Sequence, residues 1–425
     1  MGRTTLRGAR ALAVLGASLA ATPALAAGYD TPILYSAQHM GMGGAAIAYV
    51  DDPTAMFHNP AGLARTMGLT LTVNATLILG SIQSTPDVTS GLTHESEPIM
   101  ALAPLIGVSA RPVDWFAFGV AFYPVASAGA KYRYDNAAGD GVENDTSVVF
   151  LEVTPSVAFK LPGNVMLGAG WRIIMASLDR TLTNSLFNFD AALSGTNLGG
   201  FRVGAQWDPI PELQIGVVYR NKTTTTLVDE SGDALTPIFP EGRRIETDFT
   251  LPSKLGFGAR LKLDPVRVAL DVEYAFQSEN EGSQFLFGEE KEPGNFPDPE
   301  DGLVNVFRWE DGITLRAGVE YALEDRYFFR GGFIYDTQVS NEKYPSAFGT
   351  PPTSTMTLTA GFGYKCNDAW KLNFGFSHRF GSTDVERGIT PEDETCLPCS
   401  GDGPYELTMT GLYLDFTYSF SNIFD

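Results

Sequence analysis

The chain has 425 residues and a formal net charge of −21, with 50 acidic against 29 basic side chains. This negative balance argues against nucleic acid as a partner, because nucleic-acid binding needs patches of basic side chains. The four histidines form no HExxH motif and no G-x-S-x-G sequence is present, so we expect no enzyme activity, no metal site and no cofactor.

The first residues have the features of an export signal. Three arginines lie within the first ten residues, an apolar run covers 11–21, and Ala24-Leu25-Ala26 fits a cleavage site. We therefore expect a signal peptide over 1–26 and a mature chain that begins at Ala27. An uncleaved membrane anchor is the alternative, and it is disfavoured because a spanning helix needs about 20 apolar residues.

From Thr70 onward, apolar and polar side chains alternate with a period of two, which is typical of strands with unlike faces. Charges or glycines interrupt every later apolar run, so no transmembrane helix is expected, and lipid otherwise tolerates closed sheets alone. Fourteen segments of this kind lie near 70–84, 97–112, 115–133, 147–161, 165–183, 197–208, 213–228, 252–263, 266–278, 312–323, 327–339, 355–366, 369–380 and 405–420.

The connections between these segments are of two kinds that alternate along the chain. One kind is short and built from turn-forming residues: 111–114, 161–164, 208–212, 264–265, 324–326 and 366–368. The other kind is longer, polar and acidic, as in the segment 279–311, which we interpret as a solvated loop. Short periplasmic turns and longer outer loops are typical of a membrane barrel, whereas a soluble β-sandwich has similar turns at both ends. The sequence therefore predicts an all-β fold, a transmembrane antiparallel barrel of about 14 strands over 69–425.

The segment before the first strand contains two short motifs, Gly41-Met-Gly-Gly-Ala45 and Asn59-Pro60-Ala61-Gly62. The first motif is not a phosphate-binding loop, since it follows no strand of a βαβ unit and lacks the P-loop lysine. Its glycines would instead let a compact segment pass close to the barrel wall. Together with Ala27-Gly28-Tyr29, these motifs resemble the N-terminal plug of the FadL/TodX-type outer-membrane transporters, which take up long-chain fatty acids or aromatic hydrocarbons.

The resemblance implies a barrel in the bacterial outer membrane, with residues 27–68 folded as a hatch that blocks the lumen. It also implies that the mature N-terminus lines an internal ligand pocket. The expected pocket and hatch residues are Ala27, Gly28, Tyr29, Asn59, Pro60, Ala61 and Gly62. The expected partners are a hydrophobic small molecule, outer-membrane lipid and lipopolysaccharide, and the protein is expected to be a monomer without a cofactor.

The family's third strand is kinked and opens a lateral window in the wall. Pro124 lies in the third predicted strand and has no N–H for the ladder, so the pairing must break or bulge there. We therefore expect a lateral opening at Tyr123, Pro124 and Gly129. A simple edge irregularity is the alternative, although a closed barrel has no free edge.

The family's first capture site is an apolar groove between its third and fourth surface loops, here about 184–196 and 229–251. The candidate capture residues are Leu186, Phe187, Phe189, Leu235, Ile238 and Phe239. Exposed apolar side chains in surface loops are explained by a hydrophobic ligand, or equally well by packing of the loops on each other.

Cys396 and Cys399 form a CxxC whose export favours a disulfide, with a redox role as a minor alternative, and Cys366 is left without a partner. The function expected overall is passive uptake of hydrophobic molecules with lateral release. No pair of basic residues identifies a carboxylate clamp in the sequence, so fatty acids and hydrocarbons both stay open. The other functional hypotheses are a docking or shuttle partner in secretion and an ordinary porin.

Overall fold

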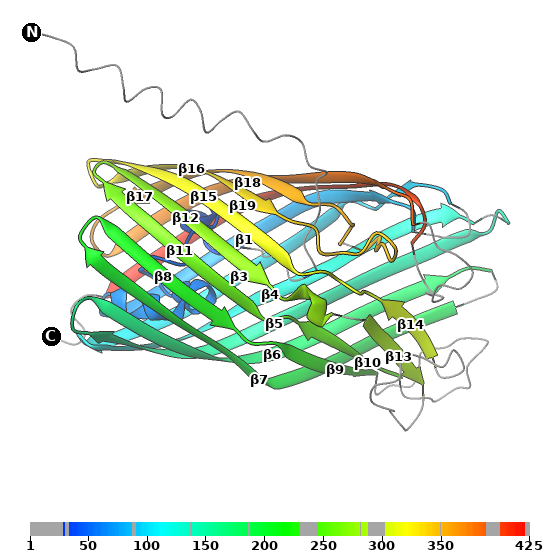
Figure 1. Ribbon diagram of the computed structural model, residues 1–425, viewed down its shortest axis with the longest axis horizontal. Coiled ribbons are helices and arrows are strands. Elements are labelled where there is room, and N and C mark those ends of the chain that lie inside the picture. Colours follow the sequence, from blue (N-terminus) through cyan, green and yellow to red (C-terminus); the bar gives the residue numbers. More distant parts are fainter. Residues whose placement is uncertain are drawn as a thin grey trace, which may run out of the picture.

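The computed structural model describes residues 29, 34–86, 91–136, 138–185, 188–229, 245–280, 282–287, 302–348, 350–387 and 400–420. Within these residues all strands join one antiparallel sheet that closes on itself (Figure 1). Closure comes from β1 (Leu69–Ser84) and β19 (Gly403–Phe420), which pair from Leu69 with Phe420 to Gln83 with Glu406. The chain therefore forms a barrel without a free sheet edge along this seam.

The described strands make fourteen spans of the wall, which confirms the predicted number. Spans two to six are β3 (Ile99–Val113), preceded by the short β2 (His94–Glu95), then β4 (Phe116–Asp135), β5 (Gly141–Leu161), β6 (Val165–Thr183) and β7 (Asn188–Ile210). Four spans consist of two strands each: β8 (Leu213–Arg220) with β9 (Thr223–Asp229), β10 (Ile245–Leu251) with β11 (Lys254–Leu263), β12 (Val266–Ala275) with β13 (Gly282–Phe287), and β14 (Gly302–Val306) with β15 (Gly312–Leu323). A 3-10 turn, η2 (Gln277–Glu279), separates β12 from β13, and the spans before β19 are β16 (Tyr327–Asp336), β17 (Thr355–Lys365) and β18 (Trp370–Val385).

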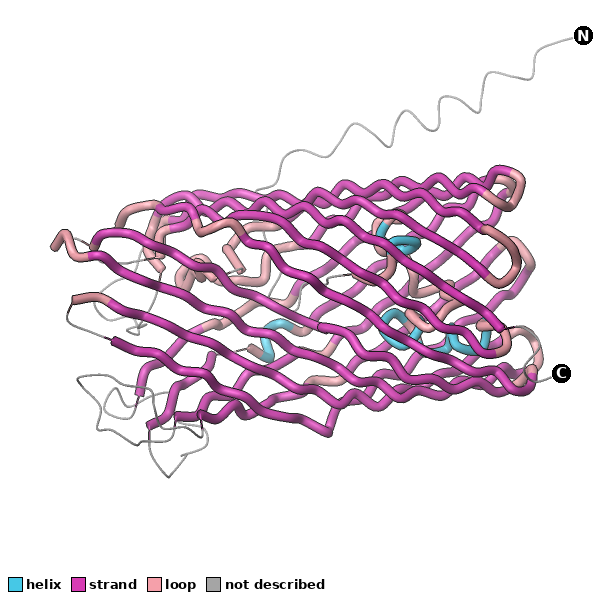
Figure 2. The backbone as a smooth tube through the Cα atoms, turned by 180° about the vertical axis from the view of Figure 1, so that it is seen from behind, coloured by secondary structure: helices cyan, strands magenta, loops and turns pink. Residues whose placement is uncertain are grey.

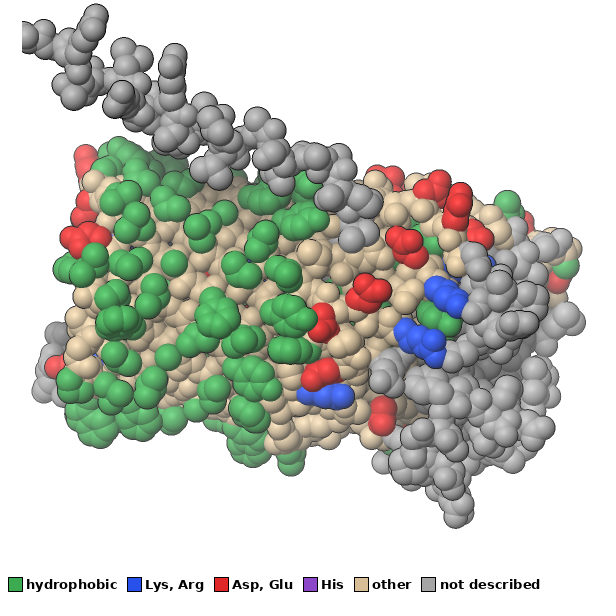
Figure 3. Space-filling model, in the orientation of Figure 1, with side chains coloured by type: hydrophobic (Ala, Val, Ile, Leu, Met, Phe, Trp, Pro, Cys, Tyr) green, Lys and Arg blue, Asp and Glu red, His purple; other side chains and the backbone are tan. Residues whose placement is uncertain are grey.

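Alternation along each strand gives the wall its two faces. In β17, Thr355, Thr357 and Thr359 are buried, whereas Met356 and Leu358 are 39% and 54% exposed. Apolar side chains gather on the outer face of the barrel over the half with the short turns, seen in green in Figure 3, whereas acidic and basic side chains lie toward the other end. So much exposed apolar surface suits lipid, and the polar side chains that alternate with it face the lumen. Among the described residues, no helix is long and apolar enough to cross a membrane.

The predicted short turns lie together at one end of the barrel, on the left in Figure 1, where β19 also ends. This is the periplasmic end of an outer-membrane barrel. At the other end two connections are shorter than predicted. β7 begins at Asn188, within the predicted loop 184–196, and β10 covers Ile245–Leu251, within the predicted loop 229–251.

The segment before β1 lies inside the barrel. It contains two one-turn helices, α1 (Ala37–Met40) and α2 (Ala55–His58), and the 3-10 helix η1 (Pro60–Arg65). Figure 2 shows these helices in cyan within the tube of strands. Most side chains over 34–66 are buried, so this segment, called the hatch below, fills the lumen near the periplasmic end.

Candidate transport pathway

Glycines of the wall form the surface on which the hatch lies. A Cβ atom at Gly216 would be 2.3 Å from the carbonyl oxygen of Ile47, and one at Gly318 would be 2.1 Å from that of Met42. Any side chain at these positions would therefore push the hatch backbone away from the wall. The wall glycines at which an added Cβ would meet backbone or side-chain atoms of the hatch are Gly107, Gly119, Gly168, Gly204, Gly216, Gly256, Gly258, Gly318, Gly332, Gly361 and Gly375.

Polar side chains of the wall also bind the hatch backbone. The Asp271 carboxylate accepts hydrogen bonds from the N–H groups of Ala46 and Ile47 at 2.8 and 2.9 Å. The ammonium group of Lys371 lies 3.0 Å from the Asp51 carboxylate. These contacts satisfy backbone and charged groups that burial would otherwise leave without partners. They tie the hatch to β12 through Asp271 and to β18 through Lys371.

Asn59 joins the hatch to the wall, and the Asn-Pro-Ala-Gly motif surrounds it. Its Nδ2 donates to the carbonyl oxygens of Ile47, Ala205 and Val217 at 2.9, 3.2 and 3.2 Å, and its Oδ1 caps η1. Pro60 starts that helix, where its missing N–H costs nothing. Ala61 and Gly62 are buried against the wall and the hatch. The motif residues therefore position the hatch.

Tyr29 is the most N-terminal described residue and lies in an aromatic cluster within the barrel. Its ring stacks on Phe150 at a centroid distance of 5.7 Å and lies 5.0 Å from Trp309, with Phe249 and Phe307 also in contact. Its hydroxyl donates to the carboxamide oxygen of Asn280 at 2.9 Å and also lies against the Thr250 carbonyl oxygen. Ala27 and Gly28 lie outside the described residues.

An apolar cavity of about 400 Å³ lies above the hatch and reaches the wall. Leu34 and Met40 of the hatch line its inner side, and Ile334 and Tyr413 line it from the opposite wall. Its outer side is lined by strands β3 and β4, including Met100, Leu102, Pro124, Ala128 and Gly129. The cavity therefore extends from the interior of the barrel to strands β3 and β4 of the wall.

The ladder between β3 and β4 is incomplete beside this cavity. The two strands pair from Ile106 with Phe122 to Val113 with Phe116. Among the described strands, residues 99–105 of β3 therefore pair with β1 but not with β4. β4 is also irregular, because its register with β5 shifts between Pro124 and Ala126. The predicted break at Pro124 is thus present as a bulge at Val125. A backbone hydrogen bond of 2.8 Å from Glu97 to Lys131 joins the chain again beyond the gap.

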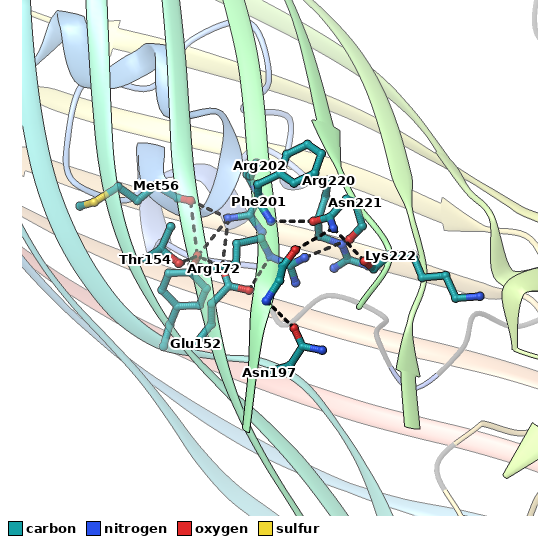
Figure 4. Close-up of polar contacts among 12 residues, drawn as sticks. Met56, Glu152, Thr154, Arg172, Asn197, Phe201, Arg202, Arg220, Asn221 and Lys222 are labelled. Carbon is teal, nitrogen blue, oxygen red and sulfur yellow. Dashed lines mark hydrogen bonds and ion pairs between the residues drawn. The ribbon is translucent and has the colours of Figure 1, made fainter. Parts of the chain in front are cut away.

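Hatch residues bind the irregular part of β4 directly. The Tyr35 hydroxyl donates to the carbonyl oxygen of Pro124 at 2.8 Å. Tyr123, which is fully buried, donates to the Glu152 carboxylate at 2.5 Å. Figure 4 shows Glu152 between two arginines: Arg172 Nε lies 2.8 Å from Glu152 Oε2, and Arg202 also donates to the Met56 carbonyl oxygen of α2 at 2.5 Å. One buried polar network therefore links the hatch, the bulge and three strands.

A second, smaller cavity of about 50 Å³ adjoins the first across Leu34. Among the described residues, its lining includes four cationic side chains and the single carboxylate of Glu273. Glu273 Oε1 lies 3.4 Å from Lys254 Nζ and 3.2 Å from Arg316 Nη2. The cationic residues are Arg202, Arg220, Lys254 and Arg316. Sequence reasoning missed this group, because alternation places a residue on the inner face without showing which strands bring their charges together.

Two hatch histidines lie beside this region. The rings of His39 and His58 are 5.1 Å apart between centroids, and in both cases burial lowers the pKa. The buried Nε2 atoms of both rings have no hydrogen-bond partner among the described residues. Neutral rings suit this environment, because a buried charge without a partner is costly.

The other candidate residues are placed differently or lie outside the described residues. Phe189 was expected in a surface loop, but it is 2% exposed, lies in β7 and packs in the interior, because pairing of β7 with β6 extends to Asn188. Cys366 has a free thiol. The candidates outside the described residues are Leu186, Phe187, Leu235, Ile238, Phe239, Cys396 and Cys399.

Comparison with known proteins gives a consistent result. A family model for "Outer membrane protein transport protein (OMPP1/FadL/TodX)" matches residues 17–395. A FadL homologue of Pseudomonas aeruginosa superimposes with a TM-score of 0.73 at 16% identity, over 94% of this chain and 100% of that chain. The Pseudomonas putida toluene transporter TodX gives 0.67 at 16% identity, over 94% and 100%. The Ralstonia pickettii toluene transporter TbuX gives 0.62 at 18% identity, over 91% and 98%. No curated protein sequence matches the chain.

Proposed function

Since the chain belongs to the FadL/TodX family of outer-membrane transporters of hydrophobic compounds, we propose that it takes up its substrate passively and releases it sideways into the membrane between β3 and β4. The observation that carries this proposal is the missing ladder beside an apolar cavity that extends from the hatch to the gap. Within the proposal, residues 1–26 are the export signal, and the hatch domain extends over residues 27–68, beyond the described segment 34–66. The signal is removed, and the barrel contacts outer-membrane lipid and lipopolysaccharide.

Lateral release suits a hydrophobic substrate energetically. Each CH₂ group that moves from water into lipid contributes about 0.8 kcal/mol, so an apolar solute needs no other source of energy. A route through the periplasmic end would cross the hatch, where backbone lies directly against wall glycines. The gap between β3 and β4 offers a path from the cavity to lipid that leaves these contacts in place.

The substrate class that we favour is a long-chain fatty acid, rather than a neutral hydrocarbon. The apolar cavity would hold the chain, and the adjoining cationic cavity would hold the carboxylate beside Lys254 and Arg316. Charge-assisted hydrogen bonds from basic side chains are strong in such an environment. The first capture at surface residues such as Leu186 and Phe239 stays part of the proposal.

Lateral release can be tested by uptake of labelled palmitate into liposomes that contain the purified protein. We expect a variant that lacks Val125 and carries Pro124→Thr to lose most of the uptake, at least tenfold, because β4 would then become regular. The control is Pro209→Thr, which removes a proline at the periplasmic end of β7. Unchanged flux through the Val125 deletion variant would contradict lateral release.

The headgroup assignment needs a second substrate with the same chain. We expect Lys254→Gln to reduce palmitate uptake about tenfold, the effect of losing about 1.4 kcal/mol of carboxylate binding. Uptake of hexadecanol should not change, since it carries no charge. Equal effects on both substrates would reject the carboxylate site but leave lateral release untouched.

A further inference from the structure

A polar cavity of about 380 Å³ lies on the other side of the hatch, at the periplasmic end. Gln38, Tyr49 and Asp51 of the hatch form one side of it, and strands from β11 to β18 form the other. No described residue lines both this cavity and the apolar cavity above the hatch. The transport pathway proposed above therefore makes no use of it.

The lining is cationic although the protein as a whole is strongly acidic. The described lining residues include six basic side chains, Arg260, Lys262, Arg267, Arg330, Lys365 and Lys371, and four carboxylates, Asp51, Glu320, Asp325 and Asp368. Asp51 neutralises Lys371 at 3.0 Å, and Asp368 pairs with Lys365 at 2.7 Å near the surface. The excess of positive charge therefore lies on the β11, β12 and β16 side.

Three guanidinium groups converge on the carboxylate of Glu320 on that side, where the exposed Asp325, 3.7 Å from Arg267, is the other carboxylate. Arg267 Nη1 lies 2.6 Å from Glu320 Oε1, Arg330 Nε lies 2.7 Å from Oε2, and Arg260 Nη2 lies 3.5 Å from Oε1. Arg330 and Glu320 are almost fully buried, with side chains 3% exposed. Like charges held this close in a partly buried site favour an additional anion.

Two basic groups in the lining have unused donors. The Nε atom of Arg267 is buried and makes no hydrogen bond among the described residues. Among the described residues, no carboxylate lies within ion-pair distance of Lys262. The aromatic rings of Tyr49, Phe328 and Tyr364 also line the cavity and give it an apolar component. The combination of cations and rings suits an organic anion better than a bare inorganic one.

Access to the cavity is from water at the periplasmic end. The ladders from β11 through β12, β15, β16 and β17 to β18 are continuous over their described lengths, so lipid has no side entry here. We propose that this cavity is a binding site for a small organic carboxylate that enters from the periplasm. The site is distinct from the uptake pathway and does not depend on which hydrophobic substrate that pathway carries.

The test is isothermal titration of the full-length protein in detergent micelles with benzoate, benzyl alcohol and inorganic phosphate, each also titrated into empty micelles. Benzoate should bind at least tenfold more tightly than either comparison compound, since benzyl alcohol lacks the charge and phosphate lacks the ring. Lys262→Gln should weaken benzoate binding about tenfold, or about 1.4 kcal/mol. This substitution leaves every ion pair among the described residues of the cavity in place, so the fold should survive it.

Two further variants make the outcome decisive. Lys160→Gln removes an exposed lysine at the periplasmic end of β5, outside the cavity. This variant should leave benzoate binding within twofold of that of the unmodified protein. Glu320→Gln removes the competing carboxylate and should tighten binding; gel mobility before and after heating checks that this variant folds, because the substitution also takes a partner from buried guanidinium groups. The proposal is overturned if benzoate gives no saturable heat, if benzyl alcohol or phosphate binds as tightly, or if Lys160→Gln weakens binding as much as Lys262→Gln.

Discussion

Glu152 holds two buried guanidinium groups at the point where the hatch contacts the irregular part of β4. The side chains of Glu152 and Arg172 are fully buried, and that of Arg202 is 5% exposed. The desolvation of three charges is offset by their mutual attraction and by hydrogen bonds from Tyr123 and Thr154. Removing one member of such a network costs more than the network contributes, because it leaves the remaining charges buried without a partner.

We therefore expect Glu152→Gln to lower the free energy of unfolding by about 3 to 5 kcal/mol. Urea titration in micelles, followed by the shift of the heat-modifiable band on gels, measures this change. The control is Glu143→Gln in the same strand, which removes an ion pair with Arg133 whose side chains are 45% and 40% exposed. An exposed pair of this kind contributes about 0 to 1 kcal/mol, so equal losses in the two variants would refute the assigned role.

At the scale of the strands, the inward glycines determine where the hatch can lie. They occur at the same level in strands far apart in the sequence, and the hatch backbone replaces the side chains that would otherwise fill the barrel. Gly332 of β16 illustrates the closeness, because a Cβ atom there would be 2.2 Å from the backbone nitrogen of Gly43. The neighbouring Gly331 has nothing nearer than 4.0 Å, and the alternation of the strand turns it to the other face.

Gly332→Val should displace the hatch and make the barrel leaky, whereas Gly331→Val in the same strand should not. The expected result is frequent opening of Gly332→Val in planar-bilayer recordings, with currents several-fold above those of the unmodified protein. Gly331→Val controls for the general effect of a larger residue in β16. Silent recordings from Gly332→Val would mean that the hatch can shift without opening a path for ions.

At the scale of the whole molecule, the architecture could be predicted from the sequence because two local signals agree. Period-two alternation identified the spans, and the short connections identified the periplasmic end. Breaks inside spans, such as that between Arg220 and Thr223, leave the alternation almost unchanged and were not predicted. Alternation assigns a wall glycine to the inner face, but it does not show that the hatch backbone lies against that position. The meeting of Arg202, Arg220, Lys254 and Arg316 depends on strand register, which alternation alone does not determine.

The fourteen spans enclose a lumen that the hatch fills, and this distinguishes the protein from an open porin. A barrel of this size lies between small barrels filled by their own side chains and the porins of 16 to 18 strands that contain an aqueous channel. Deleting residues 34–66 should therefore leave a folded barrel with a continuous water-filled pore, because the exposed inner face is polar and charged.

Single-channel recording tests this expectation. The unmodified protein should show little conductance, and the deletion variant should show large, stable openings, with gel mobility before and after heating as the check that the barrel has folded. The inner face carries Asp271 and Asp415, whose carboxylates accept hydrogen bonds from hatch N–H groups and would then bind water instead. A large conductance in the unmodified protein would mean that the hatch does not seal the lumen, and the porin hypothesis would replace the one argued above.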